Sequence, residues 1–278
     1  MNLSQEIITA EKLYRLKLEN FFSTIYKESG LHSHGIEHHR RVWTYSRELI
    51  SYPETANLIT GELFPLKLLI ASYLHDSGMS VDHGPRHGHI SRTYCEQFLQ
   101  YNNLVVNDFT DVLEAVENHD NKDYLKERTE SELLKVLTVA DDMDALGYTG
   151  IYRYLEIYLK REIPYEELGK HIKSNSTGRF SNMVRKFGHI APVLERESRR
   201  FEIISEFCLN YNNQLPGYKF GSGKPSGYCG IAEMINLIPE KSLTLESLFR
   251  IAEKPSADPF LKNYFRNLEK ELSDNKIK

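Results

Sequence analysis

Apolar side chains recur at steps of three and four residues along most of the chain, which is the pattern of amphipathic helices. Segment 3–26 shows it with Ile7, Leu13 and Leu16, and the segment that follows Gly35 continues it. The alternation of apolar and polar residues that marks a β-strand is almost absent. The pattern therefore predicts an all-α fold.

Further helices are predicted along the rest of the chain, with short connections as in a compact bundle. They are expected at about residues 64–76, 88–101, 109–119, 130–146, 150–161, 165–187 and 190–213, with two shorter helices after the Gly- and Pro-rich loop at 215–230. A capping box, Thr129 followed three residues later by Glu132, predicts where the helix at 130–146 begins.

Composition indicates an ordinary globular protein. The 278 residues are 40% hydrophobic and 27% charged, which suits one large domain with an added lobe. A net charge of −4 gives no general attraction to nucleic acid or to an anionic membrane, and no apolar run approaches the roughly 18 residues of a membrane span. Three separated cysteines indicate neither a disulfide framework nor a thiolate zinc site. We expect a cytoplasmic protein that binds no nucleic acid and no membrane, and the sequence is compatible with a homodimer.

The stretch YLHDSG places His75 and Asp76 at the polar end of an apolar run, LKLLIASYLHD. Histidine is concentrated around it, since nine of the eleven histidines lie between positions 32 and 119. A single histidine is usually a surface or hydrogen-bonded core residue, but carboxylates accompany this cluster at Asp76 and in the stretch VADDMDALG. Together these residues indicate a functional site.

Two imidazoles and two carboxylates can meet if three helices converge. Successive residues on a helix diverge by about 100°, yet His75 and Asp76 differ in length and can reach one cation near a helix end. His38 and Asp141, the latter at the polar end of ELLKVLTVADD, would complete the set, whereas Asp142 should point away. Mixed nitrogen and oxygen ligands suit divalent Mn, Fe, Co, Ni, Zn or Mg. The sequence therefore predicts a divalent metal ion held by these four ligands.

The motifs resemble, in order and spacing, those of the HD-domain superfamily of metal-dependent phosphohydrolases. The stretches HGIEHHRRVW, YLHDSG, HGHIS, ENHD and VADDMDALG carry the resemblance over roughly residues 31–160. It is strongest to the small bacterial branch with H-x-x-R-V, HD and A-D-x-x-D-A-L-G motifs. The resemblance implies a helical bundle with the same four metal ligands, and two residues that support them, Arg41 and Asp144.

The resemblance also suggests how the chain is organised. We expect the N-terminal helix, residues 1–30, to pack on an HD phosphohydrolase core at 31–160. Residues 161–278 exceed the compact family core and carry no recognised motif. Their amphipathic helices need apolar partners, so they are expected to pack on the core as a helical C-terminal lobe that shapes or covers the cleft.

Other histidines bear on the number of metal ions. The loop SGMSVDHGPRHGHIS contains His83, His87 and His89. The resemblance implies that His87 or His89 could bind a second metal ion or the substrate phosphate, and the H-x-x-x-S spacing favours His87. In ENHDNKD, a single His119 followed by Asp120 stands where two-metal branches have paired histidines. We therefore expect one metal ion per chain.

The expected chemistry is phosphoester hydrolysis. A divalent cation lowers the pKa of bound water to about 7 and polarises a phosphoryl oxygen. The catalytic candidates are Asp76, His87 and His119, with one of the two histidines protonating the leaving oxygen. The candidates for binding the substrate are Arg86, Lys122 and Arg153. The expected substrate is a small phosphoester, in the first place a nucleotide.

Two other functions stay open. A regulatory protein could keep the metal site and bind a nucleotide with little turnover. Alternatively, a closed metal site with no exchangeable position would only staple the bundle. The loop at 82–89, rich in Gly, His and Arg, argues against a staple, which needs no such loop.

Overall fold

The computed structural model describes residues 2–26, 31–59, 61, 63–121, 130–241 and 243–274, and within these ranges every regular element is helical. The expected all-α fold is therefore confirmed. None of the described helices is both long and apolar enough to cross a membrane.

The N-terminal half is a bundle around one apolar helix. Its helices are α1 (Leu3–Ala10), α2 (Leu16–Ile25), α3 (Ile36–Ser51), α4 (Phe64–Leu74), α5 (His87–Tyr101), α6 (Thr110–Asn118) and α7 (Glu132–Asp144). Helix α4 is buried on all sides from Leu68 to Leu74 and contacts each of the other six. A helix that is hydrophobic all round belongs in a protein interior. The polar pair that follows it, His75 and Asp76, is consequently buried inside the bundle.

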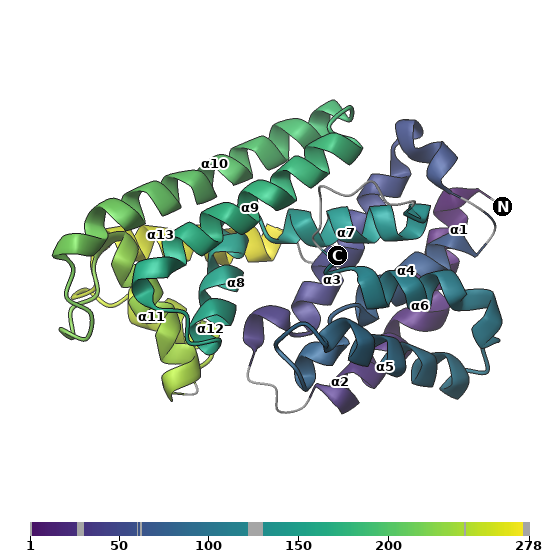
Figure 1. Cartoon of the computed structure of the whole chain (residues 1–278), viewed down its shortest axis with the longest axis horizontal. Coiled ribbons are helices and arrows are strands. Elements are labelled where there is room, and N and C mark those ends of the chain that lie inside the picture. The colour runs from purple at the N-terminus through teal and green to yellow at the C-terminus, as the bar shows by residue number, and fades with distance from the viewer. Residues whose placement is uncertain are drawn as a thin grey trace.

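The C-terminal half has a second apolar core. It comprises α8 (Gly147–Lys160), α9 (Tyr165–Phe187), α10 (Ala191–Gln214), α11 (Gly227–Lys241), α12 (Leu245–Ala252) and α13 (Pro259–Asp274). Figure 1 shows the long α9 and α10 side by side, reaching from this half toward the first. At that end Met183, Phe187, Ile190 and Val193 join the N-terminal core, so α9 and α10 connect the two cores.

Most helix bounds agree with the apolar periodicity. The seven helices predicted between residues 64 and 213 begin and end within three residues of their predicted limits. The segment expected as one helix at 3–26 is interrupted by a π turn at Glu11–Arg15. Helix α7 is capped by the Ser131 hydroxyl, which accepts from the N–H of Leu134 at 3.2 Å, and Thr129 lies outside the described residues. Short 3-10 turns occur at His32–His34, Pro53–Leu58, Ser77–Ser80, Val106–Phe109 and Leu215–Gly217.

Helix α8 packs with the C-terminal half. The second core already includes Ala145, Leu146 and Leu155, and α8 contacts α10, α11 and α13. The motif-based limit at residue 160 had grouped this helix with the N-terminal part. The apolar packing instead changes from the first core to the second at the turn between α7 and α8.

That turn is held by residues of the C-terminal half. Gly147 has a φ of +69°, and a Cβ there would lie 2.5 Å from a carboxylate oxygen of Glu271, so the position requires glycine. Arg200 of α10 donates to the carbonyl oxygens of Met143 (2.8 Å) and Leu146 (2.9 Å). Each of these carbonyl oxygens also accepts a backbone N–H, from Leu146 and from Gly150, so Arg200 uses their second lone pairs. The acidic end of α7 is thereby fixed in place.

Replacing Arg200 with alanine should destabilise the fold. The change removes the cap of α7 and one of the two guanidinium partners of the fully buried Glu197, which lies 2.8 Å from Arg200. Because breaking a buried ion pair costs about 3–5 kcal/mol, chemical denaturation should show a loss of at least about 2 kcal/mol. The neighbouring Arg199 is exposed and pairs with Glu195, so Arg199→Ala should change stability by no more than about 0.5 kcal/mol. Equal losses in both variants would contradict the capping role.

Candidate metal centre

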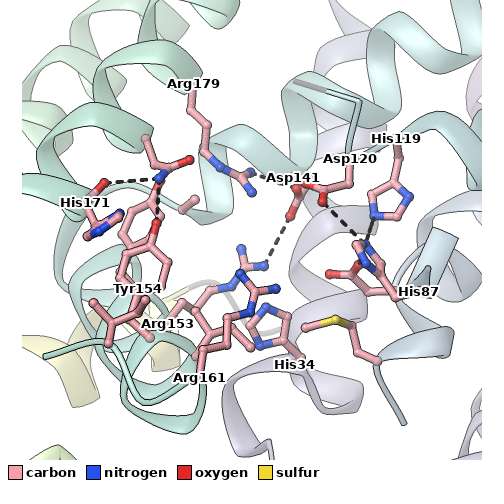
Figure 2. A pocket seen from close by; sticks show the side chains of 17 residues that line it. His34, His87, His119, Asp120, Asp141, Arg153, Tyr154, Arg161, His171 and Arg179 are labelled. Atoms are coloured by element: carbon pink, nitrogen blue, oxygen red, sulfur yellow. Dashed lines mark hydrogen bonds and ion pairs between the residues drawn. The ribbon is translucent and has the colours of Figure 1, made fainter. Parts of the chain in front are cut away.

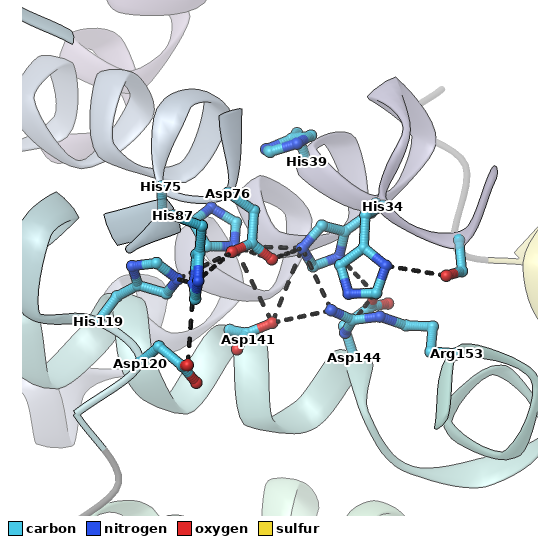
Figure 3. Close-up of polar contacts among 12 residues, drawn as sticks. His34, His39, His75, Asp76, His87, His119, Asp120, Asp141, Asp144 and Arg153 are labelled. Carbon is cyan, nitrogen blue, oxygen red and sulfur yellow. Dashed lines mark hydrogen bonds and ion pairs between the residues drawn. The ribbon is translucent and has the colours of Figure 1, made fainter. Parts of the chain in front are cut away.

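Four side chains from three helices converge inside the N-terminal half (Figure 3). They are His38 on α3, His75 and Asp76 at the end of α4, and Asp141 on α7, and all four are buried. Each offers one ligand atom, and these atoms lie within 4.8 Å of one another. The structure thus brings together the two imidazoles and two carboxylates that the sequence predicts as metal ligands.

The end of α4 explains how two neighbours in sequence share one site. His75 keeps helical backbone angles, whereas Asp76, with φ −102° and ψ 12°, departs from them and precedes the 3-10 turn Ser77–Ser80. The change of direction brings Asp76 Oδ2 to 3.6 Å from His75 Nε2. A continued helix would have turned the two side chains about 100° apart.

Hydrogen bonds on the far side of each imidazole determine which nitrogen faces the site. His75 Nδ1 lies 3.0 Å from Ser72 O and carries the proton, because a carbonyl oxygen can only accept. His38 Nδ1 lies 2.8 Å from the Asp144 carboxylate in the same way. Burial lowers the pKa of His75 to about 3, so this ring is neutral at pH 7. The Nε2 atom of His75 therefore presents a lone pair to the site, the form in which histidine binds metals, and the Nε2 atom of His38 faces the same site.

The four ligand atoms lie at or slightly beyond the spacing of ligands around one divalent cation, with His75 Nε2 and Asp141 Oδ1 4.0 Å apart. The two Nε2 atoms are 3.1 Å apart, and His38 Nε2 lies 3.4 Å from Asp76 Oδ2 and 3.7 Å from Asp141 Oδ1. Ligands that lie about 2.1 Å from one ion are roughly 3.0–3.4 Å apart in octahedral or tetrahedral geometry. Lone pairs and carboxylates at these distances repel one another unless a positive charge lies between them. A cation would therefore stabilise this arrangement.

Asp144 supports the site from behind. Arg41 donates to both of its carboxylate oxygens (2.6 and 3.0 Å), and Arg153 adds a bond of 3.1 Å. Burial alone would raise the pKa of Asp144, but these guanidiniums hold it far below its usual value. The ionised carboxylate accepts the Nδ1 proton of His38 and orients that ring for metal binding. These contacts suit the supporting role expected for Arg41 and Asp144.

Asp76 also belongs to a second buried group (Figure 3). Its Oδ1 lies 2.9 Å from His119 Nε2 and 3.4 Å from His87 Nε2, while its Oδ2 faces the first group. The Nδ1 atoms of these two rings lie 2.7 Å from Val116 O and 2.6 Å from Gly84 O, so their Nε2 atoms point inward. Asp76, His87 and His119 could therefore hold a second cation. From the sequence, both histidines are predicted as catalytic residues, and of the two only His87 is considered for a second metal ion.

A proton competes for this second position. Burial alone would lower the pKa of His119, but the neighbouring Asp76 carboxylate raises it instead. When His119 is protonated, its Nε2–H donates to Asp76 Oδ1, at the place where a second cation would bind. The second group also has three ligands rather than four, so it is the weaker of the two.

A cavity of about 340 Å³ opens beside the two groups (Figure 2). The groups line one end, and the opposite wall comes from α8 and α9. Arg153 of α8 and Arg179 of α9 each bind one oxygen of Asp141, at 3.2 and 2.8 Å. Burial alone would raise the pKa of Asp141, but the two guanidiniums hold it well below its usual value. The C-terminal half is therefore part of the site.

The three cations predicted to bind the substrate have different positions. Arg153 lines the cavity. Arg86 does not, because it pairs with Asp82 at 2.7 Å and its side chain is 82% exposed. Lys122 lies outside the described residues.

Sequence reasoning missed the residues that α9 brings to the site. Arg179 connects Asp141 with Asp142, at 2.8 and 3.0 Å, and Asn182 binds the other oxygen of Asp142 at 2.7 Å. Asp142 therefore points away from the metal ligands, as the helical periodicity predicts. The stretch STGRFSN around Arg179 contains no motif, and an arginine on an amphipathic helix is normally assigned to solvent.

Comparison with known proteins identifies one part of the chain. Residues 35–146 match the family model of the HD domain. The matched part begins just before α3 and ends just after α7, so it contains both groups of candidate ligands. Comparisons with curated proteins and with solved structures find no match.

Alanine substitutions should distinguish the two groups by metal content. Asp76→Ala removes a ligand from both groups and should lose nearly all bound divalent metal, as should His75→Ala. His87→Ala affects only the second group and should keep the first metal ion. Elemental analysis after loading with excess Mn²⁺ and desalting measures these contents. His89→Ala is the control, because His89 is exposed and pairs with Glu117. Metal contents like that of the wild type in Asp76→Ala and His75→Ala would contradict the assignment.

Proposed function

Because residues 35–146 place the chain in the HD-domain superfamily, we propose that it is a metal-dependent phosphohydrolase that cleaves a phosphomonoester or phosphodiester bond in a nucleotide or a related small molecule. One observation carries the proposal: four converging ligand atoms lie next to a cavity whose wall contains arginines. HD domains are generally found in hydrolases of this kind. The cavity volume of about 340 Å³ suits a small molecule rather than a polymer.

The site combines a place for a cation with positive side chains. A divalent cation held by the first group would supply acidified water and polarise a phosphoryl oxygen. Arg153 and Arg179 lie on the cavity side of Asp141. An anionic group that enters the cavity therefore meets two guanidiniums beside the metal ligands, where they can stabilise the charge that develops during phosphoryl transfer.

We further propose that Asp76 bridges two cation positions, in place of the single metal ion expected from the sequence. The support is the position of its two oxygens, one facing His38 and the other facing His87 and His119. With a second cation bound, the Nε2 atoms of these two histidines act as ligands and cannot protonate the leaving oxygen. With one cation bound, they keep the acid role predicted from the sequence. Bound-metal stoichiometry therefore decides which role His87 and His119 have.

A nucleotide-binding regulatory protein with little turnover is the second candidate. The favouring observation is that the two cavity arginines beside the metal ligands already have carboxylate partners: Arg153 binds Asp141 and Asp144, and Arg179 binds Asp141 and Asp142. Guanidiniums neutralised in this way have less charge to offer a transition state. A metal ion that only staples the bundle is less well supported, because such an ion needs no cavity beside it.

A comparison of Asp141→Asn with Asp142→Asn tests the proposal. Asparagine keeps the size of aspartate but loses the charge that binds a hard cation. Asp141→Asn should therefore lose bound metal, and its hydrolysis of 4-nitrophenyl phosphate, bis(4-nitrophenyl) phosphate and a nucleotide panel should fall by about 100-fold or more. Asp142→Asn should keep its metal and a rate within about ten-fold of wild type, because Asp142 contacts α9 rather than the ligands.

Melting temperatures are measured for both variants, and the loss of stability should be smaller than the loss of activity in Asp141→Asn. Equal losses of metal and rate in the two variants would show that Asp141 is not the fourth ligand. Wild-type protein that carries metal and hydrolyses none of these esters would favour the regulatory protein.

A further inference from the structure

The cavity has one half with carboxylates and one half without them (Figure 2). Its lining carboxylates all belong to the candidate metal groups or lie beside them: Asp76, Asp120 and Asp141. Among the described lining residues, the other half contains no acid and includes Tyr154, Tyr158 and Arg161. The two halves should therefore bind different parts of a ligand.

Helix α8 brings the donors of the acid-free half to one wall. Tyr154, Tyr158 and the C-cap residue Arg161 follow one another at steps of four and three residues, which keep them on one face of the helix. Arg153, the residue before Tyr154, also lines the cavity and binds the metal-ligand candidate Asp141. The acid-free half consequently continues directly from the metal ligands.

Two phenol hydroxyls on this wall can donate to a ligand. Tyr154 is only 6% exposed, and its hydroxyl has no hydrogen-bond partner among the described residues. A buried hydroxyl without a partner is unfavourable, so a ligand acceptor would satisfy it. The hydroxyl oxygen of Tyr158 accepts a bond of 2.6 Å from Asn175 Nδ2, which leaves its own proton available for donation.

Arg161 adds a positive charge that pairs with no carboxylate of the described residues. Its Nε donates to His83 O at 2.8 Å, and one of its terminal nitrogens donates to the same carbonyl. Unlike Arg153 and Arg179, it forms no ion pair within the described part of the chain. The side chain thus reaches from the end of α8 to the loop before α5 while keeping its charge for a ligand.

We infer that the substrate carries a second anionic group, a phosphate or a carboxylate, bound by Arg161 and by the hydroxyls of Tyr154 and Tyr158. Because no described carboxylate competes for these three donors, they favour a ligand group that accepts hydrogen bonds. The positive charge of the guanidinium favours an acceptor that is anionic. Arg161 and Tyr154 are then specificity-determining residues. The inference rests on the proposed function, because it assumes that the phosphoester itself lies at the metal groups.

Binding of matched phosphonates tests this inference. Wild-type protein loaded with Mn²⁺ is titrated by calorimetry with 3- and 4-carboxybenzylphosphonate and with their carbamoyl counterparts, which have the same shape without the second charge. At least one carboxy isomer should bind about ten-fold more tightly than its counterpart, the gain expected from one charge-assisted hydrogen bond. Arg161→Gln should reduce that ratio to about two-fold while the carbamoyl compounds keep their affinity. Tyr154→Phe should lower the ratio as well.

The control variant is Arg199→Gln, since Arg199 is an exposed arginine outside the cavity, and it should keep the wild-type ratio. Equal affinities within both pairs, no binding of any compound, or a preference that survives in Arg161→Gln would overturn the inference. Hydrolysis of 4-carbamoylphenyl phosphate is measured in parallel. Turnover without a charge preference in binding would support the proposed function and contradict the second anion site. A charge preference without turnover would support the second anion site and contradict the proposed phosphohydrolase activity.

Discussion

The burial of several carboxylates at one place is the constraint on which the rest of the structure depends. Four aspartates are buried around the ends of α4 and α7: Asp76, Asp141, Asp142 and Asp144. Ionised carboxylates in a protein interior must be paired with cations or bind a metal ion. Among the described residues, the buried arginines that pair with these aspartates are Arg41, Arg153 and Arg179, and the buried His119 lies 2.9 Å from Asp76. A divalent cation would add positive charge beside Asp76 and Asp141, so metal binding should stabilise this interior.

The same constraint makes the C-terminal half part of the centre. The HD-domain match ends at residue 146, whereas Arg153 and Arg179, which neutralise Asp141, come from α8 and α9. Arg200 of α10 caps the end of α7 from the same side. The matched part therefore contains the candidate ligands but not the cations that keep Asp141 ionised. This half also forms the cavity wall opposite the metal groups, so on our proposal it would influence which ligand the cavity accepts.

Local patterns in the sequence predicted the helices and the first ligand group, because apolar periodicity and motif spacing are properties of neighbouring residues. The second group depends on packing, since His87 begins α5 and His119 follows α6, and only the contact between these helices brings the two rings together. Arg179 was missed for the same reason: it lies 38 residues from Asp141 in sequence. Arg86 was assigned to the substrate from its place in the loop, but Asp82, one turn earlier, binds it instead.

We have proposed that the buried imidazoles and carboxylates of residues 35–146 hold two divalent cations that Asp76 connects. Anomalous diffraction from crystals grown with saturating Mn²⁺ would locate these cations without reference to the protein chain. We expect a peak among His38, His75, Asp76 and Asp141. We also expect a second, weaker peak near His87 and His119, about 3.5–4 Å from the first, the usual separation in two-metal sites. Manganese bound by other residues, or no peak at this centre, would contradict the proposal.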